Sequence, residues 1–192
     1  MAEALMRAKL SPACAITVAS AGTAGDGTPP PPEAVRVMAS VGLDIEGRPS
    51  RPVDADDLRQ ADLVVTMGRQ HLIDVATTYP PVLERAFTFA DLLDRASRAG
   101  ARGPSETVAQ WARRMSAGRE RNSILTLPAS DDIADPIGRP LKEYEDCFAI
   151  LDRATTQLAS HLCPGVRRLP AAGPRPGTGR RGLLARLGLS RP

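Results

Sequence analysis

The feature that most constrains the fold is a short, mainly apolar run at residues 61–67 (ADLVVTM), which ends at Gly68. A run of this kind, rich in β-branched residues, is typical of a strand that is buried on both faces. Similar runs at residues 16–20 (ITVAS) and 86–89 (AFTF) predict two more strands. Helical segments separate the three runs, and strands that alternate with helices predict an α/β fold with a parallel sheet.

The helical segments are predicted from their apolar spacing and end signals. The clearest covers residues 142–162, where Tyr144, Leu151 and Leu158 are among the apolar residues that recur at spacings of three, four or seven. A Pro-Gly pair follows it and predicts its end. Further helices are predicted at residues 1–10, 33–41, 54–60, 69–78, 90–98 and 105–123.

Charge is unevenly distributed along the chain. The formal net charge is +3, but residues 164–192 hold seven arginines and no acidic residue. Without them 18 basic and 22 acidic residues remain, so we expect no nucleic-acid binding by the body. We predict one domain over residues 1–163 and a disordered basic tail, rich in Pro, Gly and Arg, over residues 164–192. The tail is either solvated without a partner or contacts an acidic partner or an anionic membrane surface.

The cysteines and the apolar runs suggest a compartment. Three cysteines at unrelated spacings, with no Cys-x-x-Cys pair, predict neither a disulfide framework nor a zinc site. No apolar run approaches the roughly 20 residues that span a bilayer, and the first ten residues do not form a signal peptide. We therefore expect a cytoplasmic protein without a metal or other cofactor.

Five pieces of sequence, in order, carry a resemblance to a known family. They are MAEAL at the first helix, SAGT at residues 20–23, PEAVRVMASVGLDI, ADLVVTMGRQHL, and DDIADPIGRPLKEYE before the last helix. Together they make residues 1–162 resemble the low-molecular-weight protein-tyrosine phosphatases. The resemblance implies a doubly wound, three-layer parallel sheet of four strands. It also implies hydrolysis of a phosphorylated protein or a small phosphomonoester.

The family's active site is a Cys-x5-Arg-Ser loop between the first strand and the first helix. Its backbone N–H groups bind the phosphate, its thiolate forms a phosphocysteine, and an aspartate protonates the leaving group. In such proteins MAEAL directly follows this loop, so we expect the first strand and the loop to lie upstream of Met1. Residues 1–192 are then inactive by themselves. Two explanations are open: a start placed downstream of the true one, or a non-catalytic binding module that has lost the loop.

Two residues match functional positions of the family. Asp135, followed by Pro136, matches the general acid, and the proline favours an extended backbone at the aspartate. Asp131 and Asp132 lie close enough in sequence to raise a carboxyl pKa, but the family position favours Asp135. Ser20 matches a serine that supports the phosphate loop, which makes it the candidate substrate-binding residue. Without the family, both are ordinary loop residues.

Four other polar residues have weaker assignments. Arg51 matches an arginine of the family, although a surface ion pair is the alternative role for it. Arg48 stands where relatives often carry a histidine. His71 and His161 are predicted on helix surfaces rather than in the site.

No cysteine of this chain is a credible nucleophile. Residues 147–153 (CFAILDR) satisfy Cys-x5-Arg, but they lack glycine and lie within a predicted helix whose N–H groups are already bonded. The absence of any cysteine between Cys14 and Cys147 also excludes the disulfide relay of arsenate reductases with this fold. The stretches after SAGT and after Asp-Pro contain no aromatic ring, so phosphotyrosine specificity is not indicated.

Overall fold

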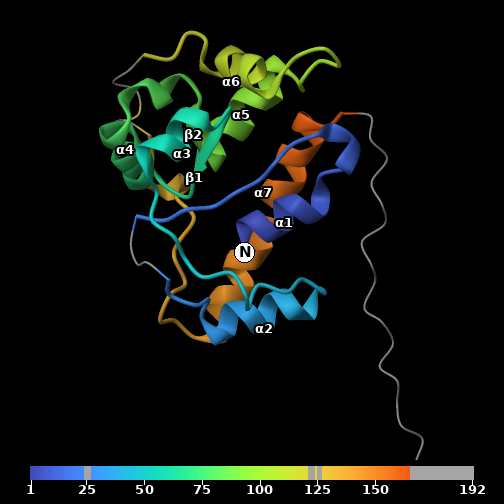
Figure 1. The fold of residues 1–192 in the computed structure, drawn as a ribbon, viewed down its shortest axis with the longest axis vertical. Coiled ribbons are helices and arrows are strands. Elements are labelled where there is room, and N and C mark those ends of the chain that lie inside the picture. Colours follow the sequence, from blue (N-terminus) through green and yellow to red (C-terminus); the bar gives the residue numbers. More distant parts are fainter. Residues whose placement is uncertain (24–26, 121–123, 125–126, 165–192) are drawn as a thin grey trace, which may run out of the picture.

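A computed structural model describes residues 1–23, 27–120, 124 and 127–164. Two parallel strands, β1 (Val64–Thr66) and β2 (Ala86–Thr88), lie at the centre of one lobe (Figure 1). The α-helices are α1 (Ala2–Lys9), α2 (Pro32–Ser40), α3 (Ala55–Gln60), α4 (Arg69–Thr78), α5 (Phe89–Ala99), α6 (Val108–Ser116) and α7 (Leu141–Leu162). Short 3-10 turns are η1 (Pro12–Cys14), η2 (Pro80–Glu84) and η4 (Ala129–Asp131). None of these helices is long and apolar enough to cross a membrane.

The two faces of the strand pair contribute to different apolar clusters. On one face Ala86 packs with residues of α3, α4 and η2, including Leu58 and Leu72. On the other face Phe87 belongs to a larger cluster with α1, α2, α5, α6 and α7, in which Trp111 is fully buried. Because successive strand residues point to opposite faces, one short strand pair supports helices on both sides. This is the layered α/β arrangement that the sequence predicts.

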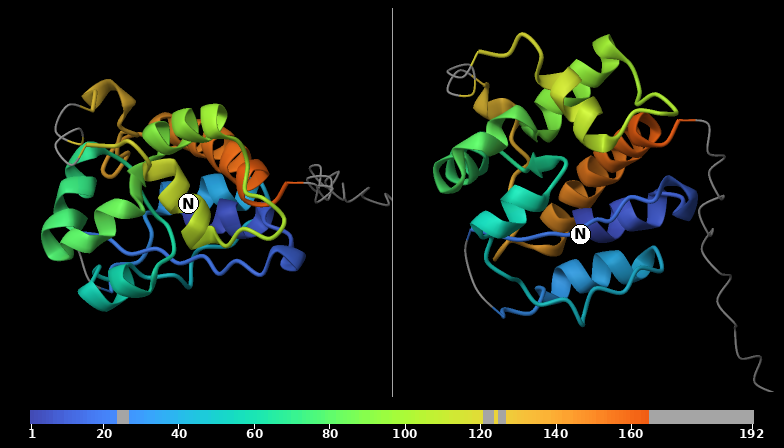
Figure 2. Two further views of the ribbon diagram at one scale, coloured as in Figure 1. Left: turned by 90° about the horizontal axis from the view of Figure 1, so that it is seen from above. Right: turned by 45° about the horizontal axis from the view of Figure 1, so that its top comes forward.

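Helix α7 is the longest element and packs against α1, α2 and α5. The views in Figures 1 and 2 show α1 and α7 side by side. Lys9, at the end of α1, holds the pair together: its Nζ donates to the Asp152 carbonyl at 2.7 Å and to the Thr155 hydroxyl at 2.8 Å. The predicted boundaries of this helix, residues 142–162, differ from the observed ones by a single residue.

The strand predicted at residues 16–20 is wrong. The segment is not assigned to a strand, and in this region the described residues contain only an isolated parallel bridge between Gly22 and Pro52. The backbone of this segment is bound by a side chain instead. The Arg7 guanidinium donates to the Val18 carbonyl through Nε at 3.0 Å and Nη2 at 2.5 Å. An apolar alternating run forms a strand only where a neighbouring strand supplies hydrogen bonds.

Helix α6 is shorter than the predicted 105–123, of which residues 121–123 lie outside the described residues. It begins after Thr107, which forms a capping box with Gln110. Glu106 is occupied elsewhere: Arg114 and the backbone N–H of Gly103 bind its carboxylate. The hydrogen bond from Arg114 holds the pKa of Glu106 at about 2, well below its usual range.

Cys14 and Cys163 form a disulfide with their Cα atoms 6.0 Å apart, although 149 positions separate them in sequence. The expectation that these cysteines remain unpaired is therefore wrong. Sequence spacing gives no information on a contact that is made only when α1 and α7 pack together. The disulfide joins the segment after α1 to the end of α7.

We predict that loss of this bond lowers the free energy of unfolding by about 2–4 kcal/mol, because it closes a long loop in the unfolded chain. Thermal unfolding should be measured for the parent protein and for Cys14→Ser/Cys163→Ser, each with and without a reducing agent. Reduction should lower the midpoint of the parent protein to that of the double variant. An unchanged midpoint of the parent on full reduction would contradict the prediction.

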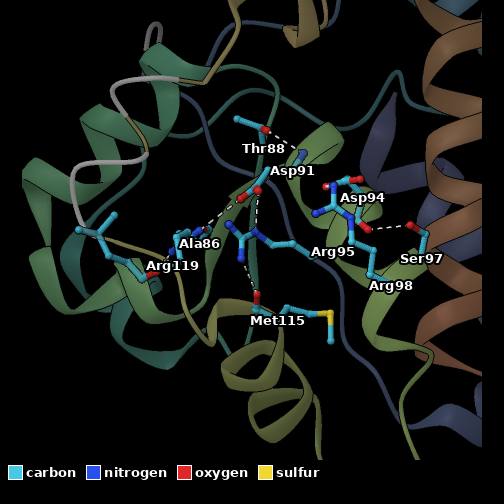
Figure 3. A network of polar contacts seen from close by, with 10 residues as sticks. Ala86, Thr88, Asp91, Asp94, Arg95, Ser97, Arg98, Met115 and Arg119 are labelled. Atoms are coloured by element: carbon cyan, nitrogen blue, oxygen red, sulfur yellow. Dashed lines mark hydrogen bonds and ion pairs between the residues drawn. The ribbon is translucent and has the colours of Figure 1, made fainter.

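A buried ion pair joins β2, α5 and the segment after α6 (Figure 3). The side chains of Asp91 and Arg119 are 9% and 6% exposed, and their charged atoms are 3.5 Å apart. Arg119 also donates to the Ala86 carbonyl at 2.8 Å and lies over the Phe87 ring, 4.5 Å from its centroid. Burial lowers the pKa of Arg119, and the negative charge of Asp91 opposes that change. Arg95 provides Asp91 with a second partner at 2.6 Å.

Removal of one partner should leave a buried charge uncompensated. We predict that Asp91→Ala destabilises the protein by about 3–5 kcal/mol in denaturant unfolding. Asp94→Ala is the matched control on the same helix, since its pair with Arg98 is exposed and should contribute at most about 1 kcal/mol. Similar losses for both variants would show that the Asp91 pair is not special.

Candidate functional site

The first turn of α1 brings together two of the polar residues that the sequence singles out, Ser20 and Arg48, through contacts with Glu3. Glu3 accepts a short hydrogen bond from the Ser20 hydroxyl, and its Oε1 accepts from Arg7 at 2.8 Å and from Arg48 at 3.0 Å. Ser20 is exposed at the end of the extended segment and reaches α1 through this contact. The structure therefore places Ser20 beside the N-terminal end of α1.

The same helix end has backbone N–H groups available. An α-helix leaves its first amide groups without intrahelical partners, and α1 has no side-chain cap at Met1. Such an end favours an anion, because the amides and the helix dipole both point positive charge outward. Burial lowers the pKa of the Met1 ammonium, while the nearby Glu3 carboxylate and Cys147 oppose that change.

Asp135 lies in the loop that connects η4 to α7. Its Oδ1 accepts from the backbone N–H of Ile137 at 3.0 Å, and the Arg139 N–H closes a turn on the Pro136 carbonyl at 2.9 Å. The side chain is exposed. These bonds give the loop a defined backbone, with the carboxylate at the surface.

Two buried residues of α7 lie within electrostatic range of Asp135. Tyr144 is 2% exposed, and its hydroxyl makes no hydrogen bond of normal geometry to the described residues. The Gly138 backbone nevertheless acts to lower the pKa of this hydroxyl. Burial, followed by the charges of Glu33 and Asp135, raises that pKa overall. Cys147 interacts electrostatically with both Asp135 and the Met1 ammonium. Cys147 thus lies within electrostatic range of both Asp135 and the N-terminal end of α1, and Ser20 contacts the first turn of that helix.

Cys147 confirms the sequence interpretation of a structural thiol. It is 7% exposed within α7, where its backbone N–H belongs to the helix. Burial raises the pKa of the thiol, and the negative charge of Asp135 raises it further. A thiol in this setting is protonated at neutral pH and is a poor nucleophile.

The remaining candidates lie outside the site. Arg51 makes a short ion pair with Asp57, as expected for a surface ion-pair former. His71 is exposed on α4, and His161 lies in the last turn of α7, at the far end of that helix from Asp135. Burial lowers the pKa of His161.

The described part of the chain contains no cluster of three His, Cys, Asp or Glu residues that could hold a metal ion. Two hollows of about 170 and 150 Å³ lie away from Asp135 and Ser20. Arg59, Arg85 and Arg113 contribute to the first, and Pro81, Leu83 and Arg119 to the second.

Sequence reasoning missed two features of the site region. The carboxylate of Asp132 lies against Gly68 and binds the backbone N–H of Arg69 at 2.8 Å. The Arg7 guanidinium donates to the Val18 carbonyl, within the segment that was expected to form a strand. A glycine immediately before a helix was the only local signal for the first contact, and none indicated the second.

The buried thiol gives a direct test of this description. Cys147 should resist alkylation by iodoacetamide at pH 7, because burial both raises its pKa and blocks access. The protein should also be unfolded without a reducing agent, so that Cys14 and Cys163 stay paired. Mass spectrometry should show labelling at Cys147 in this unfolded sample and not in the folded protein. Rapid labelling of the folded protein at this residue would contradict the assignment of a structural thiol.

A model of the family described as low molecular weight phosphotyrosine protein phosphatase matches residues 1–104. No curated protein matches the sequence. The structure is similar to the YwlE arginine phosphatase from Geobacillus stearothermophilus, with a TM-score of 0.59, 21% identity, and coverage of 84% of this chain and 82% of that one. It is also similar to a low molecular weight protein tyrosine phosphatase from T. tengcongensis, with a TM-score of 0.56, 26% identity, and coverage of 82% and 86%. A third similar structure is the tyrosine phosphatase Wzb from Escherichia coli K30 in complex with sulphate. Its TM-score is 0.57 and its identity 18%, with coverage of 84% of this chain and 87% of that one.

Proposed function

The chain belongs to the low-molecular-weight phosphotyrosine protein phosphatase family and has its α/β fold, and from this premise we propose that it serves phosphoester hydrolysis through a phosphocysteine intermediate. Asp135 is the proposed general acid and Ser20 the proposed support of the phosphate-binding loop. The observation that supports the proposal is that Cys147 interacts electrostatically with both Asp135 and the N-terminal end of α1, where Ser20 contacts Glu3. A phosphate bound there would have amide groups on one side and a carboxylic acid on the other.

We propose that the nucleophile comes from a Cys-x5-Arg segment outside residues 1–192. Within these residues the only match to that spacing is in α7, where Cys147 is buried. Two observations support an added segment. Among the described residues β1 pairs with β2 alone, and α1 has no side-chain cap. A strand followed by a loop would satisfy both.

In the proposed reaction the thiolate attacks phosphorus and the leaving oxygen departs from it. Asp135 gives its proton to that oxygen, and the resulting carboxylate then takes a proton from the water that releases phosphate from sulfur. The Asp135 turn, held by the Ile137 N–H, leaves the carboxylate at the surface, where a leaving group can reach it.

The substrate is proposed as a phosphorylated protein or a small phosphomonoester. Ile137, which follows the Asp-Pro pair, is 64% exposed and offers an aliphatic rather than an aromatic contact. Residues 24–26, after SAGT, lie outside the described residues. The similar structures bear the names of an arginine phosphatase and of tyrosine phosphatases, so both phosphorylated side chains belong in a substrate test.

A non-catalytic binding module remains the second candidate. The observation that favours it is that no cysteine within residues 1–192 meets the needs of a nucleophile. Such a module would use the uncapped end of α1 to bind a phosphorylated ligand without turning it over.

A cytoplasmic location and the partners of the tail also remain proposals. The Cys14–Cys163 disulfide counts against a reducing compartment, where such bonds are rare. Residues 165–192 lie outside the described residues. Contact of the tail with an acidic partner or an anionic membrane surface therefore stays a prediction from its charge.

The decisive experiment compares residues 1–192 with a form that carries a preceding strand and Cys-x5-Arg loop. The first should not hydrolyse p-nitrophenyl phosphate, and the second should. In the active form Asp135→Asn should slow a substrate with a poor leaving group, such as phenyl phosphate, by about 10²–10⁴-fold. A 2,4-dinitrophenyl phosphate should be affected less, because its leaving group needs less protonation.

Asp131→Asn is the matched control, since Asp131 is exposed in η4 and its carboxylate contacts only the neighbouring Ser130 among the bonds seen. The general-acid assignment fails if Asp135→Asn retains full activity on phenyl phosphate. Activity of residues 1–192 that survives replacement of all three cysteines would refute the phosphocysteine mechanism. Binding of phosphate by residues 1–192 without turnover would favour the module.

A further inference from the structure

We propose that Asp132 is a positioning residue that anchors the loop carrying Asp135 to the N-terminus of α4. The inference rests on the proposed function for its catalytic meaning, but the anchoring itself can be tested without activity. It assigns different roles to acidic residues that are nearly adjacent in sequence.

Two hydrogen bonds join the start of this loop to the end of β1 and the beginning of α4. Asp132 Oδ1 accepts from the backbone N–H of Arg69 at 2.8 Å, across 63 positions of sequence. The N–H of Ile133 donates to the Met67 carbonyl, also at 2.8 Å. The first bond uses a side chain and the second does not, so a substitution at Asp132 removes one and spares the other.

Helix α4 lacks a cap from its own sequence, because its N-cap residue is Gly68. Asp132 supplies the missing acceptor and places a negative charge at the positive end of the helix dipole. The carboxylate is exposed, so the contact is a local surface anchor and not part of the buried core.

Gly68 leaves the space that the Asp132 carboxylate occupies. A Cβ atom at Gly68 would lie 2.7 Å from Asp132 Cγ and 2.8 and 3.0 Å from its two oxygens. The backbone of Gly68 has φ −162°, an extended conformation open to any residue. A side chain at Gly68 would therefore have to displace the Asp132 carboxyl, which fills this space.

The anchor bears on Asp135 because only two residues separate them. Beyond Asp135 the chain passes through the turn at Pro136 and enters α7 after Pro140. The loop is consequently held at one end by α7 and at the other by Asp132 and Ile133. Ile133 also packs against the larger apolar cluster, which makes it the competing anchor.

The experiment compares Asp132→Ala, Asp132→Asn and the control Asp131→Ala in residues 1–192. Amide hydrogen exchange is measured at two N–H groups. That of Arg69 donates to Asp132, and that of Ile137 donates to Asp135. Asp132→Ala should speed exchange at both by about fivefold, the factor expected for loss of one capping hydrogen bond. Asp132→Asn keeps an acceptor oxygen and should restore most of the protection, and Asp131→Ala should change neither amide.

Gly68→Ala approaches the same contact from the other side. Its methyl group should displace the carboxylate and reproduce the exchange pattern of Asp132→Ala. In combination with Asp132→Ala it should add little, because the group it collides with is already gone. Additive effects of the two substitutions would overturn the proposed contact.

In the active form, Asp132→Ala should reduce kcat for phenyl phosphate more than for 2,4-dinitrophenyl phosphate, by up to about 10²-fold for a misplaced catalytic group. Asp132→Asn should recover the ratio. Faster exchange at Arg69 with unchanged exchange at Ile137 and an unchanged leaving-group ratio would reduce Asp132 to a helix cap and overturn the proposal. If no form is active, the proposed function fails, and the exchange at Ile137 still decides whether Asp132 anchors the loop.

Discussion

The packing of α7 against α1 is the contact on which the site depends. Asp135 precedes α7, Tyr144 and Cys147 face inward from its first turns, and the N-terminal end of α1 lies across from them. Lys9 fixes the other end of α1 by binding the Asp152 and Thr155 oxygens of α7. A shift of one helix along the other would move the loop that carries Asp135 relative to the amide groups of α1, because this loop leads directly into α7.

The elements that sequence predicts well are those whose signal is local. The apolar stripe of α7 gives its boundaries to within one residue, and the run at β1 is a strand as expected. The run at residues 16–20 has an equally good strand composition but forms none, because a strand needs a partner and composition cannot supply one. The disulfide between Cys14 and Cys163 was missed for a related reason: only the α1–α7 packing brings the two thiols together.

The candidate site shows the same division. Asp135 and Ser20 were proposed through family position, and the structure adds their contacts: Ser20 with Glu3 of α1, and Asp135 with the backbone of its own loop. The run Asp131-Asp132-Ile133-Ala134-Asp135 gives no local reason to separate its three carboxylates. Their partners separate them: Ser130 for Asp131, the start of α4 for Asp132, and the loop's own backbone for Asp135. The partner of Asp132 lies 63 positions away in sequence, and no periodicity of the sequence records such a contact.

The two chemical roles of a phosphocysteine mechanism place opposite demands on the backbone. A nucleophilic loop must turn its N–H groups toward the phosphate, whereas a general acid needs an exposed carboxylate on a loop whose own N–H groups are satisfied. The backbone N–H groups around Cys147 are hydrogen-bonded within α7, and burial raises the pKa of its thiol. The correct Cys-x5-Arg spacing there therefore provides neither N–H groups for a phosphate nor a reactive thiolate. The loop at Asp135 meets the second demand through the Ile137 and Arg139 bonds. Backbone hydrogen bonding therefore distinguishes the Asp135 loop, which meets the second demand, from the Cys147 helix, which does not meet the first. This distinction does not use the sequence pattern.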